Sequence, residues 1–177
     1  MASLTDFRNK LTGGGARANQ FSVRINSPFI QDVEALSFLC RSASLPAMTI
    51  GEVPVFYRGR QIYVAGDRTF ADWTITVYND GGWVARSNME NWNNALQEIG
   101  ESTVGAQDPS QYYGQILVTQ LDRSDNPLRR AILSNAWPTN VAEIALAYDT
   151  VDVVEEFDVT FRFNYMQLSG SGSTLGS

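Results

Sequence analysis

Hydrophobic and polar residues alternate along most of the chain, which is the pattern of half-buried β-strands. In residues 72–80, Trp73, Ile75 and Val77 share one face of such a strand. The alternation also predicts strands at residues 21–25, 38–43, 115–121, 128–136 and 144–148, a turn at 137–140, and a long last strand with Phe157, Val159, Phe161, Phe163 and Tyr165 on one face. The chain is therefore predicted to be mainly β.

Residues 53–64 are predicted to form a β-hairpin with Gly59 near its turn, because apolar residues occur on both sides of that glycine. Pro54 cannot donate a backbone hydrogen bond, so we expect this hairpin at a sheet edge or projecting from the body. Arg58 and Arg60 lie at its tip, where they are available to carboxylates of another molecule.

A polar corner follows at residues 66–69, between two predicted strands. Asp67 and Arg68 can pair within a turn shaped by Gly66, or they can meet a neighbouring subunit. The spacing of these residues leaves both interpretations open.

One packed helix is predicted at residues 83–99, because apolar side chains recur there at helical spacing and Gly100 follows. Its apolar face holds Ala85, Met89, Trp92, Leu96 and Ile99, and its polar face holds Arg86, Asn93, Asn94 and Gln97. We expect the polar face to look outward.

The chain is predicted to have one folded domain between two arms. Leu4, Phe7 and Leu11 have helical spacing ahead of three glycines, which indicates a flexible or partner-docked arm. The end of the chain is rich in Ser and Gly and is expected to be flexible. The domain is predicted to be an antiparallel β-sandwich or open barrel with one packed α-helix. The three parts are residues 1–19, 20–168 and 169–177.

Composition removes several classes of function. The 177 residues include no His and one Cys, Cys40, so a catalytic triad and the usual zinc sites are excluded. Asp122, Asp125 and Asn126 lack the spacing of a calcium loop and indicate a hairpin turn. We therefore expect no enzyme activity, no metal and no cofactor. The net charge of −6 argues against binding of nucleic acid, because binding to phosphates requires clustered cations.

Three segments resemble the tail tube proteins of contractile-tailed bacteriophages of the T-even type. The longest is residues 62–80, IYVAGDRTFADWTITVYND. WPTNV at residues 137–141 and EFDVT at residues 156–160 follow in the same order. The resemblance covers most of residues 20–166 and leaves out both arms.

The resemblance implies a structural subunit that forms hexameric rings. In that family the rings stack into a hollow tube inside a contractile sheath, strands from each subunit line the lumen, and DNA passes through without specific binding. The implied partners are copies of the chain itself, the tail sheath protein, and the baseplate and tail terminator proteins, with no membrane. The implied location is the virion, after assembly in the host cytoplasm.

These implications give provisional roles to three groups of residues. The ring or stacking interface is expected at Pro54, Arg58, Gly59, Arg60, Asp67 and Arg68. The lumen or an outer polar face is expected at Thr74, Thr76, Asp158 and Thr160, small polar and acidic groups that would not hold DNA. A sheath-facing helix surface is expected at Arg86, Asn93, Asn94 and Gln97.

Two other functions stay open at this stage. The inner tube of a secretion or extracellular contractile injection system would share the fold and the stacking, but its cargo would be protein. A β-sandwich that binds a ligand would need exposed aromatic residues, for which Trp83, Tyr112 and Tyr113 are the candidates.

Overall fold

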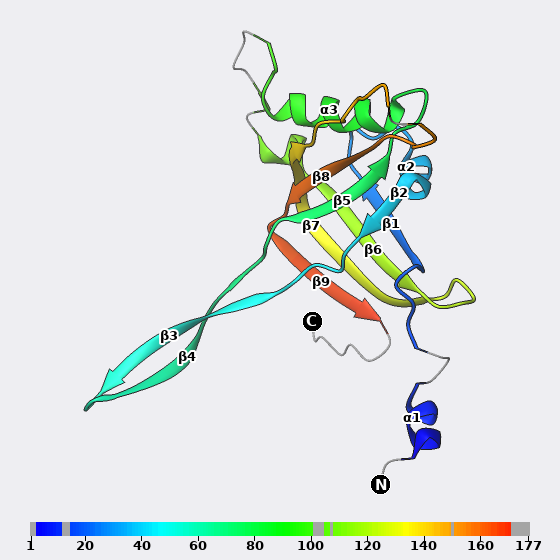
Figure 1. Ribbon diagram of the computed structural model, residues 1–177. Helices are drawn as coiled ribbons and strands as arrows, with labels where there is room; N and C mark the ends of the chain where they lie inside the picture. Colours follow the sequence, from blue (N-terminus) through cyan, green and yellow to red (C-terminus); the bar gives the residue numbers. More distant parts are fainter. Residues whose placement is uncertain (1–2, 12–14, 101–104, 107, 150, 171–177) are drawn as a thin grey trace.

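The computed structural model describes residues 3–11, 15–100, 105–106, 108–149 and 151–170 (Figure 1). Its helices are α1 (Leu4–Lys10), α2 (Val33–Leu39), α3 (Val84–Leu96) and a short 3-10 helix (Pro109–Gln111). Its strands are β1 (Phe21–Asn26), β2 (Cys40–Ala43), β3 (Thr49–Tyr57), β4 (Arg60–Thr69), β5 (Trp73–Tyr78), β6 (Gly114–Leu121), β7 (Pro127–Val141), β8 (Glu156–Arg162) and β9 (Tyr165–Gly170). The predicted mainly β fold is confirmed.

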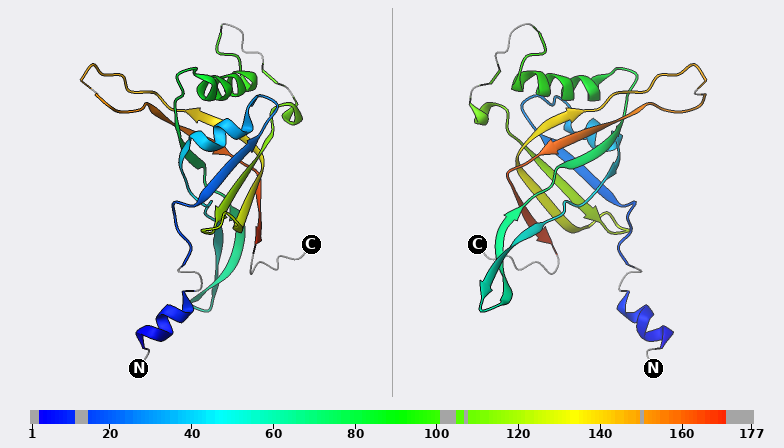
Figure 2. Two further views of the ribbon diagram at one scale, coloured as in Figure 1. Left: turned by 90° about the vertical axis from the view of Figure 1, so that its right-hand side faces the viewer. Right: turned by 60° about the vertical axis from the view of Figure 1, so that its left-hand side comes forward.

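The body consists of two antiparallel sheets that share the long strand β7. The first, called sheet I here, has the order β1-β6-β7-β9, and the second, sheet II, has the order β7-β8-β5-β2. The first part of β7 pairs with β9, as at Ser134 and Tyr165, and its last part pairs with β8, as at Trp137 and Arg162. The two sheets curve into an open barrel (Figure 2). Buried apolar side chains from both sheets fill the space between them.

The turn predicted at residues 137–140 is wrong, because these residues continue β7 into sheet II. The bend lies just before them. Asn135 has a φ of 55° and is skipped in the pairing between β6 and β7. A residue bulged in this way redirects a strand without ending it, so one strand can serve both sheets.

Trp92 of α3 anchors the helix to the core between the sheets. Its ring centroid lies 5.8 Å from that of Phe161, which in turn lies 5.9 Å from Trp73. Gly114 lies directly against the indole, because a Cβ there would come within 2.7 Å of it. The indole N–H donates to the carbonyl oxygen of Tyr112 at 2.7 Å. The predicted packed helix is confirmed, although it ends at Leu96.

The strand predicted at residues 38–43 is shorter than expected, because α2 occupies Val33–Leu39. Asp32 caps this helix by accepting from the amide of Ala35 at 2.9 Å, and Leu36 is buried. An Asp at the N-cap position favours a helix start that alternation alone does not reveal. The strand begins only at Cys40, whose half-buried thiol has a pKa raised to about 11 by loss of solvent.

The C-terminal half of the chain also departs from the predicted pattern. Residues 144–148 form no strand, and Ile99 is exposed beyond the end of α3. The last strand is two strands, because the chain leaves sheet II after Arg162 and joins sheet I at Tyr165. Of the predicted tail 169–177, the first two residues complete β9 and the rest lies outside the described residues.

The hairpin predicted around Gly59 is confirmed and is longer than expected. β3 and β4 form a separate two-stranded sheet that extends away from the body (Figure 1). Arg58 and Gly59 have φ values of 46° and 79°, as a two-residue hairpin turn requires. Asp67 and Arg68 do not form a corner. They continue β4, next to an irregularity where the pairing shifts opposite Gly51.

Asp80 holds the first turn of α3, and its removal is expected to weaken the fold. Its carboxylate accepts from the amides of Val84 at 3.2 Å and Ala85 at 3.1 Å, and the Ala85 bond is the main reason that its pKa is lowered from 3.8. We expect Asp80→Ala to lower the free energy of unfolding by about 1 kcal/mol.

Since the folded-state pKa of Asp80 is lowered, this stabilisation is complete above the ordinary value of 3.8 and is lost as the pH falls through the folded value. Urea unfolding of both proteins between pH 7 and pH 2.5 checks this. If the difference in unfolding free energy between the two proteins stayed constant down to pH 2.5, the proposed role of the Asp80 charge would be contradicted. Asp80→Asn, which keeps an acceptor oxygen, is the matched control.

Candidate assembly surfaces

The β3–β4 hairpin carries large apolar side chains on both of its faces. Every residue of β3 is exposed, and in β4 only Gly66 is partly covered. The exposed apolar residues include Ile50, Val53, Val55, Phe56, Tyr57, Ile62, Tyr63 and Val64. Because successive strand residues point to opposite faces, runs such as Val55–Tyr57 leave both faces uncovered. A surface of this kind indicates burial against other molecules.

The hairpin also contains all six residues that the sequence assigned to a ring or stacking interface. Arg58 and Gly59 form its turn and Arg60 begins β4. The Arg58 guanidinium lies 5.3 Å from the centroid of the Tyr57 ring. Pro54 lies within β3, while Asp67 and Arg68 lie at the base of β4. The assignment of these residues to an interface stays a prediction.

Sheet I ends in a different outer strand on each side. Within the described residues, β1 pairs only with β6, and β9 pairs only with β7. β1 runs parallel to β7, because both are antiparallel to β6, whereas β9 is antiparallel to β7. The two outer strands of sheet I therefore run in opposite directions. Unpaired strand edges are templates for pairing with another chain.

Sheet II presents a polar outer face that holds four of the predicted residues. The hydroxyls of Thr74 and Thr160 lie 3.0 Å apart. The hydroxyl of Thr76 donates to Asp158 at 2.7 Å. Beside this cluster, Arg162 pairs with Asp72 at 2.7 Å. The structure brings these residues together as one surface, whose position in an assembly the sequence had left open.

The outer face of sheet I was missed by the sequence assignment. Pairing register places Arg24, Gln115, Leu117, Arg130, Ile132, Tyr165 and Gln167 on it. Amide, hydroxyl and apolar groups dominate this face, with two arginines and no acid among the residues of these four strands that point outward. Alternation predicted strands at residues 21–25 and 115–121, but the sequence did not show that β7 is shared between two sheets, on which this face depends.

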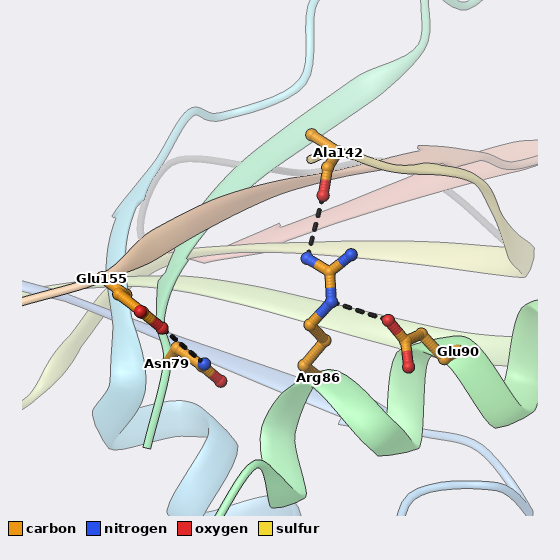
Figure 3. Close-up of polar contacts among 5 residues, drawn as sticks. All are labelled: Asn79, Arg86, Glu90, Ala142 and Glu155. Carbon is orange, nitrogen blue, oxygen red and sulfur yellow. Dashed lines mark hydrogen bonds and ion pairs between the residues drawn. The ribbon is translucent and has the colours of Figure 1, made fainter. Parts of the chain in front are cut away.

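Two of the four residues predicted on the outward face of α3 point into the fold. Arg86 pairs with Glu90 at 2.6 Å and donates to the Ala142 carbonyl at 2.9 Å (Figure 3). Asn93 donates to the Pro138 carbonyl at 3.1 Å. Both side chains are only partly exposed, because α3 lies against β7 and the loop after it. The outward stripe of α3 is Val84, Ser87 and Asn91 instead.

The other two residues of that set lie at the end of α3. Asn94 is partly exposed, and its side-chain oxygen accepts from the amide of Ile99 at 2.8 Å. Gln97 is exposed and forms the C-terminal cap position of the helix. Of the four, Gln97 is the one whose side chain is exposed, and its assignment to a sheath contact stays a prediction.

The loop between β7 and β8, described at residues 142–149 and 151–155, is held by hydrogen bonds at both ends and forms one wall of a groove. Arg86 holds its start at Ala142, and Asn79 holds its end by donating to the Glu155 side chain at 3.1 Å (Figure 3). The groove has a volume of about 900 Å³. Its lining includes Leu39, Tyr78, Ile144, Leu146, Val153 and Val154, together with Asp152, Glu155 and Glu156.

Nothing in the described part of the chain is arranged as a metal site, since no group of three or more Cys, Asp or Glu residues gathers there. Asp122 accepts from the amides of Ser124 and Asn126, and these bonds lower its pKa, as expected of a turn. None of the described helices has the length and apolar character needed to span a membrane. Tyr112 and Tyr113 pack against Trp137, so they do not present a flat aromatic platform.

The sequence matches the phage tail tube protein family over residues 11–168. It is 34% identical over 157 residues to the tail tube protein gp19 of Enterobacteria phage T4, covering 88% of this chain and 93% of that one. The chain belongs to the phage tail tube protein family. The resemblance to T-even-like tail tube proteins is thereby confirmed, and the tail tube protein is a structural component of a contractile phage tail and not an enzyme.

Solved structures show the same fold in more distant proteins. One is the sheath-tube complex of an extracellular contractile injection system in its extended state, with a TM-score of 0.66 at 12% identity, covering 97% of the tail tube protein and 100% of that chain. Another is the baseplate of the anti-feeding prophage, described as six-fold symmetrised, with a TM-score of 0.65 at 14% identity, covering 88% and 95%.

Proposed function

We propose that the tail tube protein closes into six-membered rings that stack into a hollow tube inside the sheath, and that DNA passes through the bore. The observation that supports this most directly is that sheet I ends in β1 on one side and β9 on the other, each of which pairs with one strand of the described part of the chain. One sheet with two such edges, running in opposite directions, can continue antiparallel from copy to copy.

Ring closure follows from the geometry of that contact. β9 of one copy would pair with β1 of the next, which is a head-to-tail interface. A head-to-tail interface produces a closed ring when the rotation from one copy to the next adds up to a full turn. The baseplate structure that contains a chain of the same fold is described as six-fold symmetrised, which supports six copies in the ring. Sheet II cannot continue in the same way, because its β7 end belongs to sheet I.

This arrangement assigns the bore to the outer face of sheet I. The inner face of that sheet packs on the core of its own chain, and the remaining bulk of each subunit fits only outside the closed barrel. Gln115 and Gln167 would then face the DNA, and Thr74, Thr76, Asp158 and Thr160 would lie outside the bore. The lining would be mostly neutral rather than acidic, with Arg24 and Arg130 as its charged groups.

The hairpin and the outer surface complete the assembly. Each hairpin has two apolar faces, so it can be covered by a neighbour in its own ring and by a copy in the adjacent ring. The exposed surface of α3, including Gln97, is proposed to contact the sheath. The baseplate and the tail terminator would bind the two ends of the tube, and the tube would assemble in the host cytoplasm before residing in the virion.

Electron microscopy of the purified protein tests this proposal. We expect rings with six-fold symmetry and an axial bore, and longer tubes at higher concentration or after addition of the natural assembly initiator. Protein that remained a single compact particle under both conditions would overturn the proposal. Rings without a bore would contradict the assignment of sheet I.

A further inference from the structure

The first helix leaves an apolar stripe without cover. Leu4, Phe7 and Leu11 are exposed by 86%, 64% and 43% and fall on one side of α1. Arg8 flanks this stripe on one side and Lys10 flanks it on the other. Asp6 lies on the opposite side, where it completes a capping box with Ser3. α1 is thus a short helix with an apolar face that is bordered by two cationic side chains.

A complementary surface exists elsewhere on the molecule. The groove beside the loop 142–155 exposes apolar side chains, among them Leu146, Val153 and Val154, exposed by 75%, 68% and 62%. Residues 142–156 contain five acids and no Lys or Arg, and Arg41, the one cation that lines the groove, is paired with Glu156, which leaves Asp152 and Glu155 without a cationic partner among the lining residues. Residues 1–19, by contrast, contain three of the thirteen cations and one acid. Apolar character and charge therefore both match between α1 and this groove.

The two surfaces lie at opposite ends of the molecule. α1 lies below the sheets, and the loop 142–155 lies at the other end beside α3, in all three views (Figures 1 and 2). In this arrangement α1 does not contact the groove of its own chain. Two copies stacked in the same orientation, however, bring the lower end of one to the upper end of the other.

We propose that α1 of each subunit docks its Leu4, Phe7 and Leu11 stripe into the 142–155 groove of a copy in the adjacent ring. Arg8 and Lys10 would lie against the acids that border the groove, such as Asp152. This inference rests on the proposed stacking of rings, and it adds a second axial contact that is independent of the β3–β4 hairpin. Mutual burial covers two apolar surfaces that solvent otherwise contacts.

Cysteine bridging tests the docking directly. Cys40 is the only cysteine and is replaced by Ala, after which Leu4→Cys and Val153→Cys are introduced into one chain. Tubes are treated with a short bis-maleimide and then denatured. Docking between rings joins copies along the tube, so the expected result is a ladder of bands that continues beyond the hexamer. A ladder that stops at the hexamer would mean docking within a ring and would overturn the proposal.

A matched control and two other outcomes complete this test. Asn9→Cys, on the polar side of α1, paired with Val153→Cys is expected to give no ladder. Intact tubes without bridging from Leu4 would refute the docking and leave the proposed function standing. Bridging of Val153→Cys to added sheath protein instead would also refute it. If the unmodified chain forms no rings or tubes at all, the proposed function fails, and the docking fails with it.

Substitutions on the stripe give a second measurement. Phe7→Glu is expected to raise the critical concentration for tube formation about tenfold or more, whereas Asn9→Glu adds the same charge outside the stripe and is expected to change it little. Arg8→Glu with Lys10→Glu should impair assembly, and Asp149→Lys with Asp152→Lys in the same chain should restore it. Equal effects of Phe7→Glu and Asn9→Glu, or no restoration, would count against the docking.

Discussion

Shortening the β3–β4 hairpin is expected to abolish tube assembly while leaving the subunit folded. Ile50 and Arg68 are paired across the hairpin, so an Asn-Gly turn can replace residues 51–67 between them. Among the described strands, β3 and β4 pair only with each other. The core around Trp92 and Phe161 therefore loses nothing, and the midpoint of thermal unfolding should stay within a few degrees of the unmodified value.

The loss of assembly should be large, because the hairpin carries much of the exposed apolar surface. Complete burial of one such side chain contributes about 1.5–3 kcal/mol. Loss of several of these contacts per subunit corresponds to a change of more than a thousandfold in the association constant. Sedimentation and electron microscopy, at ten times the critical concentration of the unmodified protein, should show no tubes. Tubes of normal length would contradict the interface assignment.

The two arginines at the tip give a graded version of the same experiment. Arg58→Glu with Arg60→Glu keeps every apolar contact of the hairpin and reverses its charge. Since an exposed ion pair contributes only about 0–1 kcal/mol, we expect weakened assembly that recovers in high salt. Arg123→Glu, in the exposed turn between β6 and β7, is the matched control and should assemble normally.

The local features of the fold were the ones that the sequence could predict. Trp73, Ile75 and Val77 alternate with polar residues and are buried, because sheet II covers one face of β5. Gly59 marked the hairpin turn, since a left-handed conformation is open to glycine. The apolar stripe through Met89 and Trp92 predicted α3. Each of these signals depends on neighbouring residues alone.

The features that were missed depend on distant partners. The sequence around Asn135 does not predict that one strand continues from sheet I into sheet II. Arg86 and Asn93 have the polar character of an outward helix face, yet carbonyls of Ala142 and Pro138 lie where these side chains can donate to them. That β1 and β9 are the outer strands of sheet I could not be predicted for the same reason, because the place of a strand in a sheet depends on the strands that surround it.

Positive charge on the outer face of sheet I is expected to slow DNA ejection. Gln115 and Gln167 are exposed on this face, on β6 and β9. Gln115→Lys with Gln167→Lys would add two cations per copy to the proposed bore. Each cation that contacts a phosphate strengthens binding in a salt-dependent way. We expect ejection from virions built with this variant to be about tenfold slower in low salt, and the difference to shrink as salt is added.

The control places the same charge on the other sheet. Thr74→Lys with Thr76→Lys adds two cations per copy to the outer face of sheet II, next to Asp158. Those residues lie outside the bore in the proposed arrangement, so ejection should proceed at the unmodified rate. The release of DNA from purified virions, followed by a DNA-binding dye after triggering, measures both variants. Slower ejection from the Thr74 and Thr76 variant alone would exchange the roles of the two sheets. That result would mean that ring closure does not proceed through the β1 and β9 edges, because the sheet that lines a closed barrel is the one whose edges join.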